Sequence, residues 1–101
     1  MKILPEPIVF EWDKGNIDKN LLKHKVTNKE AEEVFGNRHF MIEDKKRSTV
    51  YERRYMLWGV TNYKRKLTII FTIRTNSIRI ISVRDMHKKE RRRYEKIETN
   101  S

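Results

Sequence analysis

The chain has 101 residues, no cysteine, and 24 Lys and Arg against 14 Asp and Glu, which gives a net charge of +10. This length predicts one domain covering residues 1–101, and the absence of cysteine excludes disulfides, thiolate chemistry and cysteine-based zinc sites. The positive charge favours an anionic partner, first of all nucleic acid, and the lack of a signal peptide and of an 18-residue apolar run predicts a soluble cytoplasmic protein with no membrane partner.

The N-terminal part of the chain predicts an extended segment followed by a helix. Residues 1–9 contain both prolines, which indicates an extended and partly mobile lead-in, and Phe10 and Trp12 predict a short strand or an anchored extended segment. Asp13 is a good N-cap for a helix over about residues 14–23. The expected inner face of this helix consists of Ile17, Leu21 and His24.

A second helix is predicted over about residues 28–35. Thr27 followed three residues later by Glu30 has the form of a capping box, and Gly36 and Asn37 are typical of a helix end. Three residues at helical spacing should face the core: Ala31, Val34 and Phe35.

Four strands are predicted in the second half of the chain, which is rich in β-branched residues. Their expected ranges are 40–42, 52–60, 67–73 and 78–83, with a turn over residues 74–77. Short connections predict an antiparallel meander, and the two preceding helices should share one of its faces. Together with the C-terminal helix described next, these elements define the predicted α+β fold.

The C-terminal helix is predicted to be strongly basic. Asp85 is the expected N-cap, and the following sequence MHKKERRRYEKI places Met86, Glu90, Tyr94 and Ile97 on one side. We expect the cationic side of this helix to hold RNA backbone. The alternative is that these charges have no partner role and form a solvated helix face, with Glu90 paired within the helix.

Strand alternation separates the arginines of the last two strands. It places Arg74 with Thr72 and Ile70, Arg84 with Ser82 and Ile80, and Arg79 on the opposite face with Ile81 and Val83. Two arginines on consecutive strands could converge on one phosphate, since a guanidinium donates two parallel hydrogen bonds to it. They could equally be charges that protect a strand edge from aggregation.

Three stretches in this order resemble the BrnT family, toxins of bacterial type II toxin–antitoxin systems with a RelE-like fold. They are FEWDKGNIDKNLLKHKV at 10–26, ERRYMLWG at 52–59, and RIISVR at 79–84 with KKERRRYE at 88–95. The resemblance covers about residues 9–96. The matching positions are Trp12, Asp13, Asn20, Lys23, His24, Ala31, Val34, Phe35, Arg54, Gly59, Thr72, Arg74, Arg79, Ser82, Arg84, Glu90, Arg91, Arg92 and Tyr94. Two positions depart from the pattern: Lys25 stands where the family commonly has Gly, which implies a different or strained helix end, and Ile73 stands where it often has Glu.

The resemblance implies a ribonuclease toxin that is neutralised by BrnA, an antitoxin with a ribbon-helix-helix DNA-binding segment. It also implies that the toxin reaches operator DNA through the complex with the antitoxin. The alternative is a noncatalytic nucleic-acid-binding module or a corepressor. The two differ in turnover, because the module has none to lose when a catalytic group is removed.

RNA cleavage without a metal needs a base for the 2′-hydroxyl, cations around the phosphate and an acid for the 5′-oxygen. The sequence has no HExxH motif and no P-loop, so we expect no metal and no cofactor. The candidate catalytic residues are Arg74, Arg79, Arg84 and His24. The candidate RNA-binding residues are Arg54, Lys88, Lys89, Arg91, Arg92, Arg93 and Tyr94. Purely structural roles are also possible: His24 could cap its helix, and Tyr94 could pack in the core. Glu52 and Glu90 could be bases or ordinary ion-pair partners.

Overall fold

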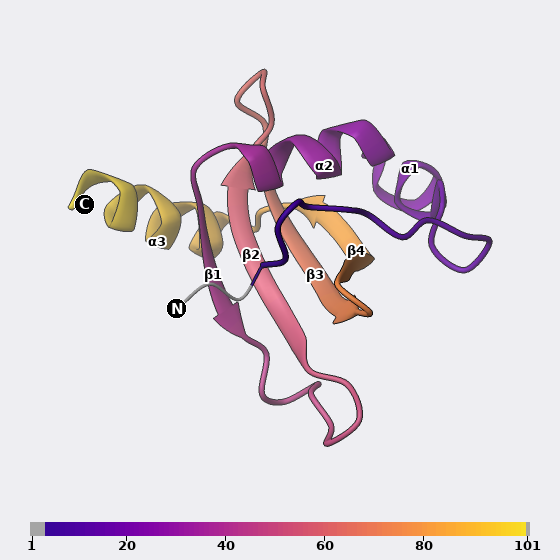
Figure 1. Cartoon of the computed structure of the whole chain (residues 1–101). Helices are drawn as coiled ribbons and strands as arrows, with labels where there is room; N and C mark the ends of the chain where they lie inside the picture. Colours follow the sequence, from indigo (N-terminus) through magenta and orange to yellow (C-terminus); the bar gives the residue numbers. More distant parts are fainter. Residues whose placement is uncertain (1–3, 101) are drawn as a thin grey trace.

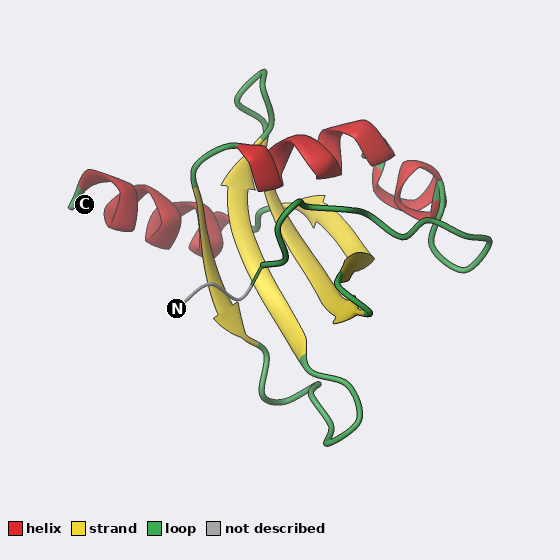
Figure 2. Cartoon of the chain, viewed as in Figure 1, coloured by secondary structure: helices red, strands yellow, loops and turns green. Residues whose placement is uncertain are grey.

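The computed structural model describes residues 4–100 and has the predicted α+β fold (Figure 2). The elements in chain order are α1 (Lys19–His24), α2 (Asn28–Gly36), β1 (His39–Glu43), β2 (Arg54–Val60), β3 (Lys66–Arg74), β4 (Ser77–Asp85) and α3 (Lys88–Thr99). The four strands form one antiparallel sheet in the order β1-β2-β3-β4, which confirms the meander. Within residues 4–100, no helix is long and apolar enough to cross a membrane.

The main core lies between α2 and one face of the sheet, here termed the α2 face (Figure 1). Its buried strand residues are Leu57, Leu67, Ile69, Phe71, Ile78, Ile80 and Val83. The three predicted core residues of α2 are buried against them. The ring of Phe35 lies edge-on to Phe71 at 5.1 Å and to Phe10 at 5.2 Å, so the N-terminal segment also closes this core.

Two local features hold α2 in place. The capping box is present: the Thr27 hydroxyl accepts from the Glu30 amide at 3.0 Å, and the Thr27 amide donates to the Glu30 carboxylate at 2.9 Å. Below the helix, a side chain at Gly59 would come within 2.6 Å of Val34, so glycine lets α2 approach β2.

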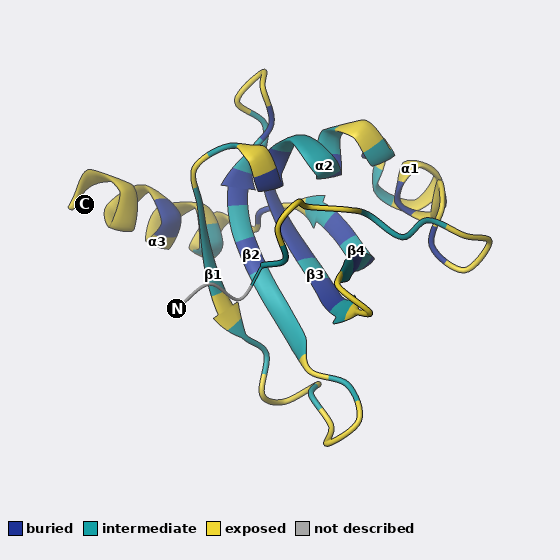
Figure 3. Cartoon of the chain, viewed as in Figure 1, coloured by how far each residue is buried: buried dark blue, intermediate teal, exposed yellow. Residues whose placement is uncertain are grey.

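The opposite face, here termed the α3 face, carries a row of paired residues across all four strands: Phe40, Trp58, Thr68 and Arg84. The helix α3 lies over this row, because the buried ring of Tyr94 packs edge-on against Phe40 at 5.6 Å and Thr68 donates to Glu90. The sheet is therefore sandwiched between α2 and α3, and Figure 3 shows that the buried positions gather on β2, β3 and β4.

The first helix differs from its prediction. It begins at Lys19, not residue 14, and Asp13 does not cap it. Ile17 and Leu21 are 45% and 41% exposed, so they do not form an inner face. The buried side chains are instead two amides, Asn16 and Asn20, because this segment packs against backbone groups of a strand rather than against an apolar surface.

Those backbone groups belong to the outer edge of β4, which the N-terminal segment covers. Residues 9–11 form a parallel bridge to Ile78, with Ile78 donating to the Val9 carbonyl and accepting from the Glu11 amide, both at 2.8 Å. Further along, Asn16 donates to the Ile80 carbonyl at 3.1 Å, and the Val83 amide donates to Asn20 at 3.0 Å. The segment thus satisfies edge groups that would otherwise be open to pairing.

The β3–β4 hairpin contains a bulge that sequence alternation missed. The register shifts between Ile70 and Phe71, so that Arg79 pairs with Thr72 while Arg84 pairs with Thr68. Residues paired directly lie on the same face, so Arg79 and Arg84 share the α3 face, and the predicted opposite orientation of Arg79 is wrong. The turn is also tighter than predicted: it consists of Thr75 and Asn76, with φ values of 48° and 63°.

The start of α3 also differs from its prediction. His87 is the N-cap residue, and its amide donates to Glu90 at 2.8 Å. Met86, Tyr94 and Ile97 were expected on one side of the helix; the first two are buried, whereas Ile97 is 40% exposed. Asp85 does not cap the helix, because its carboxylate is held by Arg65 at 2.8 and 3.1 Å.

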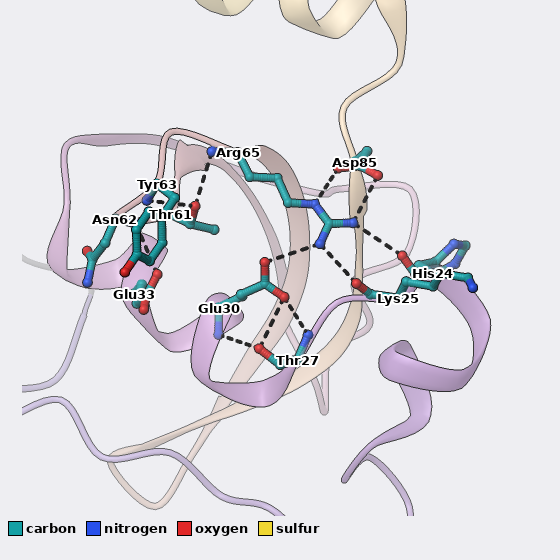
Figure 4. A network of polar contacts seen from close by, with 10 residues as sticks. All are labelled: His24, Lys25, Thr27, Glu30, Glu33, Thr61, Asn62, Tyr63, Arg65 and Asp85. Carbon is teal, nitrogen blue, oxygen red and sulfur yellow. Dashed lines mark hydrogen bonds and ion pairs between the residues drawn. The ribbon is translucent and has the colours of Figure 1, made fainter.

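Arg65 joins four segments (Figure 4). Besides Asp85 at the end of β4, its guanidinium donates to the Lys25 carbonyl at 2.9 Å, to the His24 carbonyl at 3.4 Å and to the Glu30 carboxylate at 3.2 Å. It therefore caps the C-terminal end of α1 and binds the first turn of α2. The hydrogen bond with Asp85 is the largest cause of the raised pKa of Arg65. No pattern in the sequence had indicated a special role for Arg65.

Candidate functional site

Three arginines come together on the α3 face at the hairpin end of the sheet. Arg54 on β2 and Arg79 on β4 both pair with Thr72, which lies between them on β3, and Arg74 follows two residues later on the same face. Neighbouring strands are about 5 Å apart, so the long side chains of these arginines can come close to one another. The arrangement arises from the register of three strands and from the bulge in β4.

The three arginines line one pocket of about 180 Å³, here termed the arginine pocket. Its wall consists of Gly15, Asn16, Lys19, Glu52, Arg54, Arg74, Arg79, Ile80 and Ile81. Arg74 and Arg79, which come from consecutive strands, therefore line the same pocket. The convergence of two such arginines on one phosphate stays a prediction. Arg54, predicted as an RNA-binding residue, lies with them.

Glu52 connects two of these arginines. Its carboxylate lies 2.9 Å from Arg74 Nη2 and 3.1 Å from Arg54 Nε, so the ion pairs expected as its ordinary role are present. The hydrogen bond from Arg74, followed by that from Arg54, holds the pKa of Glu52 below its usual value. Glu52 is therefore ionised at neutral pH, and the same ion pairs weaken it as a proton acceptor.

Arg79 forms a bidentate ion pair with Asp13. Arg79 Nη1 and Nη2 donate to the two Asp13 oxygens at 2.7 and 2.9 Å, and Glu11 lies 3.9 Å away. This contact is the largest cause both of the lowered pKa of Asp13 and of the raised pKa of Arg79. A side chain at Gly15 would come within 2.8 Å of Arg79 Nη2, so the position of this guanidinium depends on a glycine.

The chemistry available in the pocket is that of an anion site. Guanidinium groups present parallel donors to phosphate oxygens, and a bound phosphate would compete with Glu52 and Asp13 for them. Among residues 4–100, no three His, Asp or Glu side chains form a group that could hold a metal ion.

Two predicted catalytic residues do not line this pocket. Arg84 donates to Glu90 of α3 at 2.7 and 3.0 Å. Burial raises the pKa of Glu90, but hydrogen bonds from Arg84, the His87 amide and Thr68 outweigh it and bring this pKa down to about 2. His24 ends α1 beside Arg65 (Figure 4).

The predicted RNA-binding residues of α3 divide into two groups. Lys88, Lys89, Arg91, Arg92 and Arg93 are exposed. Tyr94 is completely buried and its hydroxyl donates to Glu98 at 3.3 Å, which fits the alternative of core packing. The exposed cations lie on the same side of the sheet as the arginine pocket, because Thr68 under α3 precedes Thr72 by four residues, or about 13 Å, on β3.

The sequence analysis did not identify Gly15 and Lys19 as pocket residues. Both belong to the segment beside β4 that was predicted as a regular helix, so their place could not follow from helical periodicity. Asp13 was predicted as a helix cap, whereas ion pairs of Glu52 with neighbouring arginines were expected. Which arginine each carboxylate holds depends on the sheet register.

The chain was compared with known protein families. Residues 12–90 match the family described as "Ribonuclease toxin, BrnT, of type II toxin-antitoxin system". The matched range contains all the residues that line the arginine pocket and ends in the first turn of α3. A comparison with curated proteins found no match.

Proposed function

The chain belongs to the BrnT family of ribonuclease toxins of type II toxin–antitoxin systems, and from this premise we propose that it is an endoribonuclease that cleaves RNA in the arginine pocket without a metal ion. Family membership implies an RNA substrate and an antitoxin partner. The observation that carries the proposal is the row formed by Arg54, Thr72 and Arg79, with Arg74 beside it and all three arginines lining one pocket with Glu52.

In the proposed mechanism, the 2′-hydroxyl of a ribose attacks the adjacent phosphorus and the bond to the 5′-oxygen breaks. Arg54, Arg74 and Arg79 hold the phosphate oxygens and stabilise the negative charge that grows on them in the transition state. Glu52 takes the proton of the 2′-hydroxyl, and Lys19 donates a proton to the departing 5′-oxygen. The products are a 2′,3′-cyclic phosphate and a 5′-hydroxyl. The earlier catalytic roles of Arg84 and His24 stay predictions, and this mechanism does not use them.

The exposed cations of α3 are proposed to bind RNA backbone beyond the cleaved phosphate. They lie on the same face of the sheet as the pocket, so one strand of RNA can follow both. Their contribution is electrostatic and independent of sequence.

The antitoxin is proposed to be BrnA-like, with a ribbon-helix-helix segment, and to cover this basic surface. Operator DNA would then be contacted through the toxin–antitoxin complex, and the protein would act in the cytoplasm, where its RNA substrate is. The RelE-like classification of the fold also stays a prediction.

A noncatalytic nucleic-acid-binding module is the second candidate. The observation that favours it is that each pocket arginine is already paired with a carboxylate, Arg79 with Asp13 and both Arg54 and Arg74 with Glu52. Such a surface binds anions by exchange of partners and needs no chemistry. Turnover distinguishes the two candidates.

The test is cleavage of labelled RNA by antitoxin-free protein in excess EDTA. The wild-type protein should cleave, and Arg79→Ala should reduce the rate about 100-fold or more. A matched control is Arg47→Ala, which removes an arginine that also pairs with one carboxylate, Asp44 at 2.8 Å, but does not line the pocket. Circular dichroism checks that each variant is folded. Intact RNA with wild-type protein, together with salt-dependent binding, would favour the binding module.

A further inference from the structure

A second pocket, of about 240 Å³, lies directly beside the arginine pocket and is here termed the tyrosine pocket. It is lined by Tyr51, Glu52, Arg53, Tyr55, Thr72, Ile73 and Arg74. Glu52 and Arg74 line both pockets, so the two pockets are neighbours, with Tyr55 and Ile73 on the α2 face and the arginine pocket on the α3 face. The tyrosine pocket is located between the start of β2 and the end of β3, beside the loop that projects beyond the sheet at the bottom of Figure 1.

The pocket is lined by tyrosine and arginine side chains, and both suit a flat aromatic ligand. Tyr51 is 96% exposed, which leaves its ring free to receive a partner. Tyr55 is held firmly, because its ring stacks on that of the buried Phe71 at 5.5 Å. Arg53 and Arg74, whose side chains end in planar guanidinium groups, also line the pocket. Aromatic rings and guanidinium planes are the surfaces on which unpaired RNA bases stack.

The backbone of Tyr51 is fixed even though its ring is exposed. The amides of Tyr51 and Glu52 both donate to the Thr49 hydroxyl, at 3.2 and 3.0 Å, and the Thr49 amide donates to the Glu52 carbonyl at 2.8 Å. The backbone of Tyr51 is therefore held at a defined place next to Glu52, so that stacking of a ligand on the ring costs only side-chain entropy.

We propose that the tyrosine pocket binds the nucleobase adjacent to the phosphate held in the arginine pocket, by stacking on Tyr51 and against Arg74. This proposal rests on the function proposed above and adds the substrate class: unpaired RNA, because a base within a duplex has no free face to stack on these side chains. Glu52 and Arg74 form a common wall at the end of the sheet, and in this proposal one nucleotide lies across that wall, with its base in one pocket and its phosphate in the other. Preference among bases at this one position then follows from how well each stacks.

The experiment measures binding of a trinucleotide with 2′-O-methyl riboses, which cannot be cleaved, and of its counterpart with the same phosphates but no bases. Wild-type protein should bind the first about tenfold more tightly than the second, the loss expected when one stacking contact is removed. Tyr51→Ala should bind both equally, and Tyr51→Phe should keep the difference. The matched control is Tyr63→Ala, which removes a tyrosine that is 92% exposed but lies in another loop; it should also keep the difference.

Because the ligand cannot be cleaved, this result does not depend on catalysis. If the wild-type protein does not cleave RNA but binds the trinucleotide with bases tenfold more tightly, and Tyr51→Ala abolishes this difference, the nuclease proposal is contradicted and the base subsite is supported. Equal binding of the two trinucleotides by wild-type protein, or an unchanged difference in Tyr51→Ala, would overturn the base subsite whether or not RNA is cleaved. Loss of antitoxin affinity in Tyr51→Ala with an unchanged trinucleotide difference would assign the pocket to a protein partner instead.

Discussion

Gly15 lies beside the ion pair of Asp13 and Arg79, and the absence of a side chain there leaves room for the guanidinium. A methyl group at this position would come within 2.8 Å of Arg79 Nη2 and 3.2 Å of Asp13 Oδ1. Residue 15 is exposed and outside the helices and strands, so the rest of the fold does not depend on it.

Gly15→Ala should therefore separate function from stability. We expect Arg79 to be displaced and RNA cleavage to fall about tenfold, while the free energy of unfolding changes by less than about 1 kcal/mol, as is usual for surface substitutions. Cleavage assays and urea denaturation measure the two effects. Unchanged cleavage would mean that the position of Arg79 is not important for the reaction.

At the level of single residues, the arginines that line the pocket were candidate site residues in the sequence, and ion pairs of Glu52 with neighbouring arginines were expected. The partner of Arg79 was not expected. Arg74, Arg79 and Arg54 follow from residue type, strand position and family resemblance, and they line one pocket. The contact between Asp13 and Arg79 joins residues 66 positions apart, and no local pattern encodes it. Asp13 has the residue type of a helix cap, and the competing ion pair took precedence over that role.

At the level of an element, one residue carries information about the end of α1. The departure at Lys25 predicted a different or strained helix end, and Lys25 has a φ of 56°, in the left-handed region. That conformation is unfavourable for residues with a side chain and readily adopted by glycine.

Lys25→Gly should therefore stabilise the protein. We expect a gain of about 0.5–1 kcal/mol in the free energy of unfolding and a rise of a few degrees in Tm, because glycine relieves the backbone strain. The Lys25 carbonyl, which accepts from Arg65, is retained. Lys25→Ala, which keeps the strain, is the control and should give no comparable gain in thermal unfolding.

The strand pattern predicted the meander, but neither the bulge in β4 nor the covered edge of that strand. The bulge adds one residue between Ile80 and Ser82, and this reverses the face on which Arg79 lies. The edge is covered by Asn16 and Asn20, which sequence periodicity treats as solvated polar residues. Both features depend on contacts between distant segments, and hydrophobic spacing carries no information about such contacts.

The attachment of α3 to the sheet should depend on pH through Glu90. The pKa of Glu90 is about 2 in the folded protein against an ordinary value of 4.5, so its contribution to stability is complete above about pH 4.5 and is lost as the pH falls toward 2. Glu90→Gln should lower stability at pH 7 by about 2 kcal/mol and flatten the acid limb of a plot of Tm against pH. Parallel curves for the two proteins would contradict this role. Asp13, Glu30, Glu52, Asp85 and Glu95 also have lowered pKa values, so the variant should remove part of the dependence only.

For the whole molecule, the net charge of +10 should appear as a steep salt dependence of RNA binding. If α3 and the arginine pocket together contact about six phosphates of single-stranded RNA, log affinity should fall against log salt with a slope of about −4. Combined Arg92→Ala and Arg93→Ala substitutions should reduce the magnitude of this slope by about 1.4, whereas Lys64→Ala in the β2–β3 loop should leave it unchanged. A slope near zero for the wild-type protein would exclude the backbone contacts proposed for α3.

Attack by the substrate's own 2′-hydroxyl in the arginine pocket is tested most directly with an RNA that lacks this group at one position. The cleavage site of a short single-stranded RNA is first mapped, and the same RNA is then prepared with a 2′-deoxyribose at that nucleotide. We predict that cleavage in excess EDTA stops at the modified site and that the unmodified RNA gives a 2′,3′-cyclic phosphate and a 5′-hydroxyl. Cleavage of the modified RNA at the same rate, or products with a 5′-phosphate, would show that the 2′-hydroxyl is not the nucleophile.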